Sequence, residues 1–484
     1  MNNQNQSLRE QASKGGRWTG YSAIVGIAVQ LAQLAILGRT LEPADFGLMA
    51  MMLFVIGVAN SIADFGLGNY LIQVETLTRR LFLRVIVIVS SLSLTLSIAI
   101  AASSSLIAEY YKQPSLTELL PLLASSVVMF TLSQLFMSVL QRVFLFRIIA
   151  IGEMISVGVS LASTTLMSMS GYGAWSLVLG TVLGSSVRAI VFGSRVVSLL
   201  ETLPVENQPE LSSVKAFALY QTGERVLNYV GSNLEKVIIG RVLGEVSLGY
   251  YTIAYQLMVK PFSILNPIFT RVALPLFSSI RSDNDRLGSG YLQIVKTIAI
   301  IVFPLYIIMA ICAPSVVVIL MGESWRESAP MLYVLSFVGM MFSIGNPIGS
   351  LILAKGQPKI SFYFNIVSTL LLAIAFWIGS RYSALGVAIG YLIVVVCILY
   401  PLEFYIRFKL VRMSIREYFR SLGHVFIAAA IPISVHAALY LPDMHPSSLS
   451  DQVALAAFSI AFFFAYLLKF ERPFINSTKS LFFK

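Results

Sequence analysis

Charged and amide side chains interrupt several apolar stretches of this chain. Within 214–240 they recur every three or four residues, which places one set on a single helix face, namely Gln221, Glu224, Asn228, Ser232 and Glu235. Arg225 lies beside that face, and Lys260 lies near the centre of the next stretch. If these stretches cross a bilayer, a lone charge at mid-depth costs about 3 kcal/mol on insertion scales. We therefore expect a water-filled cavity or an ionic partner beside them, where a cation can attract an anion and a carboxylate can exchange a proton.

Neighbouring stretches carry further polar side chains at comparable depth. Gln256 lies one turn before Lys260, Asp64 lies in the second apolar stretch, and the first stretch carries Gln30 and Gln33. We expect these polar faces to meet at one interface within the protein.

Each of these residues also has a purely structural interpretation. Glu224 and Arg225 could neutralise one another or a charge on a neighbouring helix, and Asp64 could be solvated near a helix end. The two glutamines of the first stretch could join helices by hydrogen bonds. Lys260 has no acidic residue within two turns on its own helix, so a role in a cavity is favoured for it.

The composition is that of a polytopic membrane protein. Apolar residues make up 57% of the 484 positions, charged residues only 12%, and the mean hydropathy is +0.81. Soluble domains carry roughly 25% charge. The first sixteen residues are polar, so no cleavable signal peptide is expected. Apolar runs of helix-spanning length predict fourteen transmembrane helices, at 17–37, 47–72, 81–108, 117–140, 149–169, 174–198, 214–240, 247–270, 291–319, 329–352, 360–380, 385–407, 420–441 and 451–470.

The distribution of basic residues predicts the orientation of these helices. Of the 34 Lys and Arg residues, 25 fall in the N-terminus, the even-numbered loops and the C-terminus, and only 5 fall in the odd-numbered loops. Because cytoplasmic loops carry this excess, both termini are expected in the cytoplasm. The net charge of +11 then reflects topology and contact with anionic lipid, and we expect no nucleic-acid partner.

An internal duplication organises the helices. Gly38-Arg39-Thr40-Leu41 with Gly47 recurs 202 residues later as Gly240-Arg241-Val242-Leu243 with Gly249, and Ala174 and Gly180 recur at an offset of 210. Each copy of the first motif follows one apolar helix and precedes another. With six helices per copy the repeats are parallel. The predicted fold is therefore all-α, with two six-helix lobes and an appended helix pair.

A polar segment marks the predicted boundary between the lobes, because no buried segment would tolerate its composition. The predicted domains are an N-terminal lobe (1–200), a cytoplasmic linker (201–213), a C-terminal lobe (214–409) and the appended pair with a cytoplasmic tail (410–484).

The chain has none of the motifs that would indicate an enzyme. It lacks a Walker sequence, a nucleophile elbow and an HExxH motif. Cys312 and Cys397 lie in apolar runs, where a thiol usually packs as a small hydrophobe, and the three histidines form no ligand cluster. We therefore expect no catalytic residue, no metal and no cofactor.

An ordered series of motifs resembles a known transporter family. The series runs through Gly16-Arg17-Trp18, Gly38 to Gly47, Asp64-Phe65-Gly66-Leu67-Gly68, Ala254-Tyr255-Gln256-Leu257, Arg271-Val272-Ala273-Leu274-Pro275 and Leu353-Ala354-Lys355-Gly356-Gln357-Pro358. It is similar to the Wzx-type polysaccharide flippases of the multidrug/oligosaccharidyl-lipid/polysaccharide superfamily, in particular the colanic-acid group. The resemblance implies two lobes around a central cavity, as in the multidrug and lipid II branches. It also implies transport of undecaprenyl-diphosphate-linked oligosaccharide across the bacterial inner membrane, for exopolysaccharide or lipopolysaccharide synthesis.

The resemblance gives the polar residues their expected roles in alternating access. Lys260 and Arg225 would attract the diphosphate, and the amides of Gln221, Asn228, Gln256, Gln30 and Gln33 would bind sugar. Glu224 or Asp64 would couple proton movement to transport. Helices 13 and 14 could frame a groove for the lipid tail. Expected partners are the lipid-linked substrate, membrane phospholipid, and the polymerase and chain-length proteins of glycan assembly.

Two other functions remain open at this stage. One is a small-molecule cation antiporter of the multidrug branch, which would share the fold. The other is a non-transporting scaffold of a glycan assembly complex.

Overall fold

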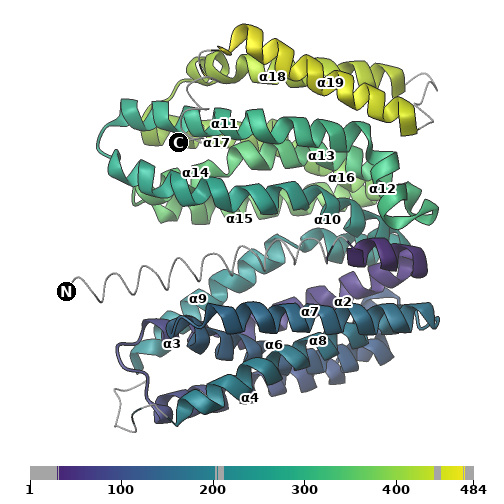
Figure 1. The fold of residues 1–484 in the computed structure, drawn as a ribbon, viewed down its shortest axis with the longest axis vertical. Helices are drawn as coiled ribbons and strands as arrows, with labels where there is room; N and C mark the ends of the chain where they lie inside the picture. Colours follow the sequence, from purple (N-terminus) through teal and green to yellow (C-terminus); the bar gives the residue numbers. More distant parts are fainter. Residues whose placement is uncertain are drawn as a thin grey trace. The chain divides into compact units, whose positions relative to one another are not determined.

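The computed structural model describes residues 30, 32–201, 204, 212–440, 449–472 and 474 of the chain. Within these ranges the backbone forms helices and the turns between them (Figure 1). Most of the predicted span 17–37, most of the linker and the tail beyond residue 474 lie outside the described residues, as does the side chain of Gln221.

Twelve helices in the described part are long and apolar enough to cross a membrane. They match twelve of the fourteen predicted stretches, with bounds Pro43–Gln73, Arg79–Ala102, Leu116–Arg142, Phe146–Met169, Ala174–Leu200, Leu234–Ser279, Asn284–Ile311, Glu323–Ala354, Pro358–Ser380, Ala384–Val411, Ile415–His436 and Leu449–Phe470. The stretch 214–240 begins as a helix, α9 (Ser212–Gly231), but three charged residues make α9 too polar to join this group. The chain is a multi-pass membrane protein, and the count of fourteen stays a prediction.

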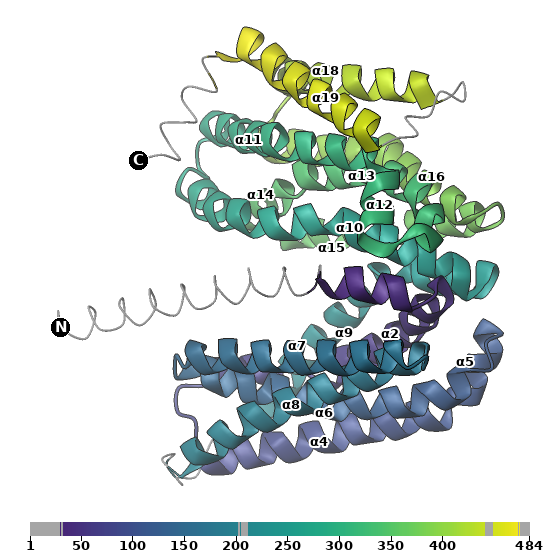
Figure 2. The ribbon, with the colours of Figure 1, turned by 45° about the vertical axis from the view of Figure 1, so that its right-hand side comes forward.

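The first of two compact units ends at Gly249. Its central helix, α6, packs on α2, α3, α4, α5 and α8, while α7 covers α8 and α9 packs on α2 (Figures 1 and 2). Small residues bring α7 and α8 together, since a Cβ on Gly180 or Gly184 would meet side chains of α7. The helix bounds are α2 Pro43–Ala63, α3 Leu67–Gln73, α4 Arg79–Ala102, α5 Ser104–Tyr111, α6 Leu116–Arg142, α7 Phe146–Met169 and α8 Ala174–Leu200.

The second compact unit runs from Tyr250 to Lys484. Its central helix, α11, packs on α13, α17, α18 and α19, and α16 packs on α13 and α15. The appended helices α18 and α19 run side by side along α11 (Figures 1 and 2). The bounds are α10 Leu234–Ser279, α11 Asn284–Ile311, α12 Ala313–Met321, the 3-10 segment η1 Glu323–Ser328, α13 Ala329–Gly345, α14 Pro347–Ala354, α15 Pro358–Ser380, α16 Ala384–Val394, the π-helical segment η2 Val395–Leu399, α17 Tyr400–Val411, α18 Ile415–Tyr440 and α19 Leu449–Phe470.

Both copies of the Gly-Arg motif precede a helix break at equivalent positions. In the first copy α2 starts at Pro43, after Glu42 in an extended conformation. In the second copy Gly244, which lies 202 residues after Glu42, interrupts α10 with φ 83° and ψ −177°. Glycine suits that position because an L side chain rarely adopts a positive φ.

Within the first unit, the helical turns that follow the two breaks pack so closely that their backbones are in contact. A Cβ on Gly47 would collide with the backbone carbonyl of Glu245, and a Cβ on Gly249 would collide with that of Pro43. Pro43 and Glu245 are 202 residues apart, as are Gly47 and Gly249, so the contact is reciprocal. Reciprocal contacts of this kind are what a two-fold relation between equivalent segments produces.

The compact units group helices by packing, and therefore differ from the predicted domains. α9 and the start of α10 fall with the first unit, whereas the duplication would assign them to the second repeat. The boundaries 1–200, 201–213, 214–409 and 410–484 stay a prediction.

Candidate functional site

Asp64 and Arg225 form an ion pair inside the first unit. Asp64 caps the C-terminus of α2, where Phe65 and Gly66 take positive φ values of 43° and 66° and turn the chain into α3. Arg225 lies on α9, and its Nη1 contacts Oδ2 of Asp64 while the two side chains stay 35% and 28% exposed. A carboxylate on a neighbouring helix, and not Glu224, thus neutralises this cation.

Tyr229, one turn beyond Arg225, fixes the same face of α9 to α2. Its hydroxyl donates to the backbone carbonyl of Leu53 at 2.9 Å, and its ring lies 6.2 Å from that of Phe54. Gly57 makes room for the ring, since a Cβ there would collide with it. This face of α9 is therefore used for packing.

The predicted polar face lies next to the packed one and is largely exposed. Glu224, Asn228 and Ser232 are exposed. Glu235 differs, because it is only 3% exposed and its Oε1 has no hydrogen-bond partner among the described residues. The most deeply buried carboxylate of this series is thus Glu235, whereas Glu224, a residue expected to couple proton movement, is exposed.

In the second unit, Lys260 lies close to the middle of an apolar helix. It is sixteen residues beyond the break at Gly244 and nineteen before the end of α10 at Ser279, or about 24 and 28 Å at the helical rise. Lys260 is half-buried, and Gln256 one turn before it is exposed. The depth of this pair in the membrane stays a prediction.

Asn266 joins α10 to the junction between α13 and α14. It lies about two turns beyond Lys260 on the same helix and accepts a hydrogen bond from the amide of Asn346. Asn346 caps α13 and precedes Pro347, the first residue of α14. By the predicted offset of 202, Asn266 would correspond to Asp64, which also makes a polar contact to another helix.

Gln30 and Gln33 lie at the start of the described chain. Gln30 is exposed and Gln33 is half-buried.

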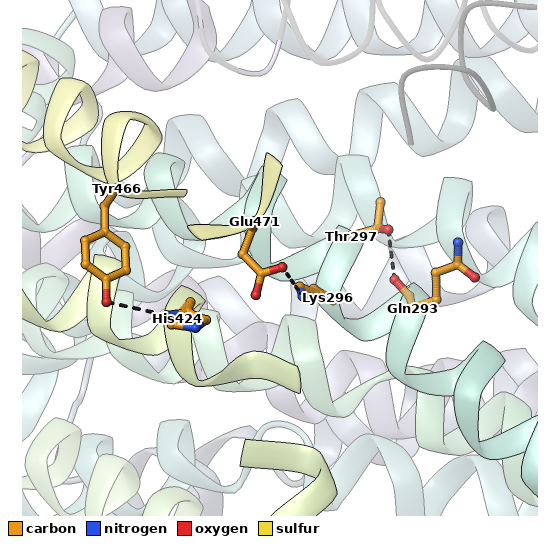
Figure 3. Close-up of polar contacts among 6 residues, drawn as sticks. All are labelled: Gln293, Lys296, Thr297, His424, Tyr466 and Glu471. Atoms are coloured by element: carbon orange, nitrogen blue, oxygen red, sulfur yellow. Dashed lines mark hydrogen bonds and ion pairs between the residues drawn. The ribbon is translucent and has the colours of Figure 1, made fainter. Parts of the chain in front are cut away.

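A buried ion pair between α11 and the end of α19 was not predicted from the sequence. Lys296 lies in the predicted stretch 291–319, within α11, and is only 7% exposed. Its Nζ contacts Oε2 of Glu471 at 2.6 Å and lies 4.6 Å from the Phe474 ring centroid. Figure 3 shows the two charged groups facing each other, with His424 of α18 near Tyr466 of α19. The pair holds the appended helices on α11.

A second buried cation, Arg407 of α17, was also missed. It is fully buried, and its guanidinium lies 2.5 Å from the Glu403 carboxylate. Its Nε donates to the hydroxyl of Tyr291 at 2.9 Å, and the rings of Tyr400 and Tyr418 both lie 5.2 Å away. A charge pair spaced four residues apart in an apolar run was the only sequence signal for this contact.

The described residues contain no group of three or more His, Cys, Asp or Glu side chains that could hold a metal ion. The polar groups described above form ion pairs and amide contacts, and Lys260 lies near the centre of α10. Such groups can attract anions and hydrogen-bond to hydroxyl groups, and one of the carboxylates, Asp64, pairs with Arg225 of α9.

Two relatives align with most of this chain. WzxC, a lipopolysaccharide biosynthesis protein of Escherichia coli K12, is 29% identical over 435 residues, which cover 90% of this chain and 88% of WzxC. The teichuronic acid biosynthesis protein TuaB of Bacillus subtilis 168 is 26% identical over 462 residues, covering 95% of each chain.

The fold is similar to that of solved transport proteins. The lipid II flippase MurJ in an inward closed conformation has a TM-score of 0.72 at 16% identity, covering 94% of this chain and 98% of MurJ. An inward-facing multidrug transporter of the MATE family has a TM-score of 0.59 at 15% identity, covering 80% of this chain and 95% of the transporter. These likenesses establish the fold alone. The family of polysaccharide biosynthesis proteins matches residues 36–330, which is more than half of the sequence, and the chain therefore belongs to that family.

Proposed function

We propose that this protein is a flippase that moves undecaprenyl-diphosphate-linked oligosaccharide repeat units across the bacterial inner membrane by alternating access. The product would supply exopolysaccharide or lipopolysaccharide synthesis. The observation that carries the proposal is Lys260, a cation in the middle of an apolar helix, in a member of the polysaccharide biosynthesis protein family. The likeness to WzxC over most of both chains and the MurJ-like fold support it.

The chemistry of the substrate explains why such a cation would be needed. A diphosphate that carries a hydrophilic glycan cannot cross hydrocarbon unaided, because removing its charges from water is very costly. A carrier must offer cations to the phosphates and hydrogen-bonding groups to the sugars. Buried or mid-membrane cations of this kind mark transport pathways in other membrane proteins.

The ion pair between Asp64 and Arg225 makes Arg225 a weaker candidate than Lys260 for binding the diphosphate. Asp64 already neutralises Arg225, which weakens Arg225 as a phosphate ligand, and we propose Lys260 at the centre of α10 as the principal one. The exposed amides of Asn228 and Gln256 remain candidates for sugar, together with Gln30, Gln33 and Gln221. We keep Glu224 and Asp64 as the proposed proton-coupling carboxylates. Transport in vesicles with and without a pH gradient, before and after Glu224→Gln, tests that assignment.

Both termini are proposed to face the cytoplasm, as the distribution of basic residues predicts. A polysaccharide polymerase and chain-length proteins are the proposed protein partners, since a flipped repeat unit must next be polymerised on the far side of the membrane.

The test is the structure of the lipid-linked oligosaccharides in a deletion strain. We expect complete repeat units on undecaprenyl diphosphate to accumulate on the cytoplasmic side, and purified protein in vesicles to restore their flipping. Increased drug sensitivity without accumulation would instead support the cation antiporter. Accumulation without any flipping by the purified protein would support the scaffold.

A further inference from the structure

An apolar groove of about 740 Å³ lies in the second unit. Its walls are α13, α18 and the continuous helix formed by α16, η2 and α17, and none of the residues that line it is charged. α18 lines the groove with Ile415, Phe419 and Phe426, which share one helical face. Ile415 and Phe419 are 59% and 49% exposed, so the groove opens at the surface of the unit.

The walls of this groove are held in place by contacts behind them. Phe404 packs edge-on against Tyr418 at 4.8 Å between ring centroids, and the buried guanidinium of Arg407 lies 5.1 Å from the Phe404 ring. The groove also passes the π-helical turn η2, a rare element that often accompanies functional sites. Because its walls are supported in this way, the groove is preformed and is not a gap left by loose packing.

One end of the groove carries an excess of positive charge. The turn between α17 and α18 and the helices beside it bear four exposed cations, Lys409, Arg412, Arg416 and Arg420. The nearby carboxylate of Glu417 is already engaged, since it accepts the backbone N–H of Ser414 at 2.9 Å. Each basic residue near a membrane surface attracts anionic lipid by about 1 kcal/mol.

The length of the groove matches one leaflet of a bilayer. From Ile415 to Phe426 along α18 there are eleven residues, or about 16 Å, and half of the ~30 Å hydrocarbon core is ~15 Å. An acyl chain that extends from a headgroup to the bilayer centre has this reach, whereas an undecaprenyl chain is several times longer. The basic end and the apolar depth together fit a phospholipid of one leaflet.

We propose that this groove binds an acyl chain of an anionic phospholipid and that Arg412 and Arg416 hold its phosphate. The groove adjoins the helix pair that was expected to frame the lipid tail of the substrate, but the proposal assigns it to a phospholipid and needs no assumption about transport. Its occupant would be a resident lipid that covers the exposed aromatic wall of α18.

Cys397 provides a reporter of occupancy. It lines the groove and is exposed, whereas Cys312, the second cysteine of the chain, is buried. The experiment measures the rate at which a maleimide alkylates Cys397 in the full-length protein, purified in detergent and freed of lipid. At about ten times its Kd, phosphatidylglycerol should slow alkylation about tenfold. Phosphatidylcholine at the same concentration should leave the rate within about twofold, since it carries no net charge.

The variants separate the headgroup site from general lipid contact. Arg412→Gln with Arg416→Gln should remove the protection by phosphatidylglycerol. The matched control, Arg79→Gln with Arg84→Gln, changes two exposed arginines of α4 and should keep it. Native mass spectrometry should show one retained phosphatidylglycerol in the control and none in the Arg412/Arg416 variant.

Three results would overturn the proposal. They are equal protection by phosphatidylcholine, full protection in the Arg412/Arg416 variant, and stronger protection by undecaprenyl phosphate than by phosphatidylglycerol. The last result would assign the groove to the tail of the transported lipid, and it would leave the proposed flippase function intact.

Discussion

Lys260 is the residue on which the proposed chemistry depends most. Replacing it with Ala removes the cation from the centre of α10, and a hydrogen bond to a charged group contributes roughly 1.5–3 kcal/mol. We expect Lys260→Ala to lower glycan export about ten- to a hundredfold, Lys260→Arg to retain most of it, and Lys260→Gln to resemble Ala. Exported polysaccharide is measured at equal membrane protein level, with Lys359→Ala at an exposed position as the control. Normal export by Lys260→Ala would remove this residue from the mechanism.

The Asp64–Arg225 pair gives a second prediction at the scale of residues. Arg225→Gln leaves Asp64 without its cation, and Asp64→Asn does the converse, so each should lower the unfolding temperature of the purified protein. The double variant should recover part of the loss, with a coupling of about 1 kcal/mol because both side chains are partly exposed. Glu224→Gln should not alter the unfolding temperature, since Arg225 contacts Asp64. A purely additive double variant would show that the two residues do not interact.

These polar residues can be predicted from the sequence, but the groups that they contact cannot. The cost of intramembrane charge singles out Arg225 and Lys260 from one sequence alone. Which carboxylate reaches Arg225 depends on how α9 packs on α2, and no periodicity contains that information. The pairing of Lys296 was missed because its partner, Glu471, is 175 residues away in the sequence and follows the last predicted stretch, so no local pattern links the two charges.

At the scale of elements, glycines set the distance between the first turns that follow the two helix breaks. Gly47→Ala and Gly249→Ala each insert a methyl group against a backbone carbonyl, which cannot move aside as a side chain can. Overpacking of this kind typically costs about 1–3 kcal/mol, and we expect a lower unfolding temperature for each. Because the two collisions belong to one reciprocal contact, the double variant should cost less than the sum.

The control for these glycines is Gly158→Ala. A Cβ at that exposed position of α7 would meet nothing within 4 Å, and alanine is favoured over glycine in a helix by up to about 1 kcal/mol. The unfolding temperature should therefore stay or rise. Equal losses at Gly158 and Gly47 would show that helix propensity, and not the close contact, determines the result.

The ion pair of Lys296 and Glu471 should anchor the appended helices on α11. Glu471→Gln leaves a buried ammonium group uncompensated, and breaking a buried pair in this way costs about 3–5 kcal/mol. Adding Lys296→Met should recover most of the stability. Glu323→Gln, which breaks an ion pair whose side chains are each 66% exposed, should cost less than about 1 kcal/mol. Thermal unfolding and protease cleavage between α18 and α19 measure both effects, and equal losses in Glu471→Gln and Glu323→Gln would contradict the anchoring role.

At the scale of the whole molecule, the sequence predicted an all-helical membrane protein, and the structure has this class of fold. Hydropathy located twelve stretches that form apolar helices, because burial in lipid requires long apolar runs. The predicted stretch 214–240 overlaps α9, but its charged residues keep α9 out of the group of twelve apolar helices, so this span stays a prediction. Packing assigns α9 to the first compact unit, and a repeat found by matching motifs cannot reveal which helices pack together.

The predicted topology is the most decisive test of the whole arrangement. Basic residues concentrate in the N-terminus, the even-numbered loops and the C-terminus, so a reporter fused after Lys484 and one inserted within 204–210 should both report the cytoplasm. A reporter inserted at 323–328, in the η1 segment between α12 and α13, should report the periplasm. Fluorescent protein and alkaline phosphatase fusions at the same sites give opposite signals and control for expression. A periplasmic C-terminus would require an odd number of spans after an N-terminus in the cytoplasm. Two parallel repeats of six helices and an appended pair would then be impossible.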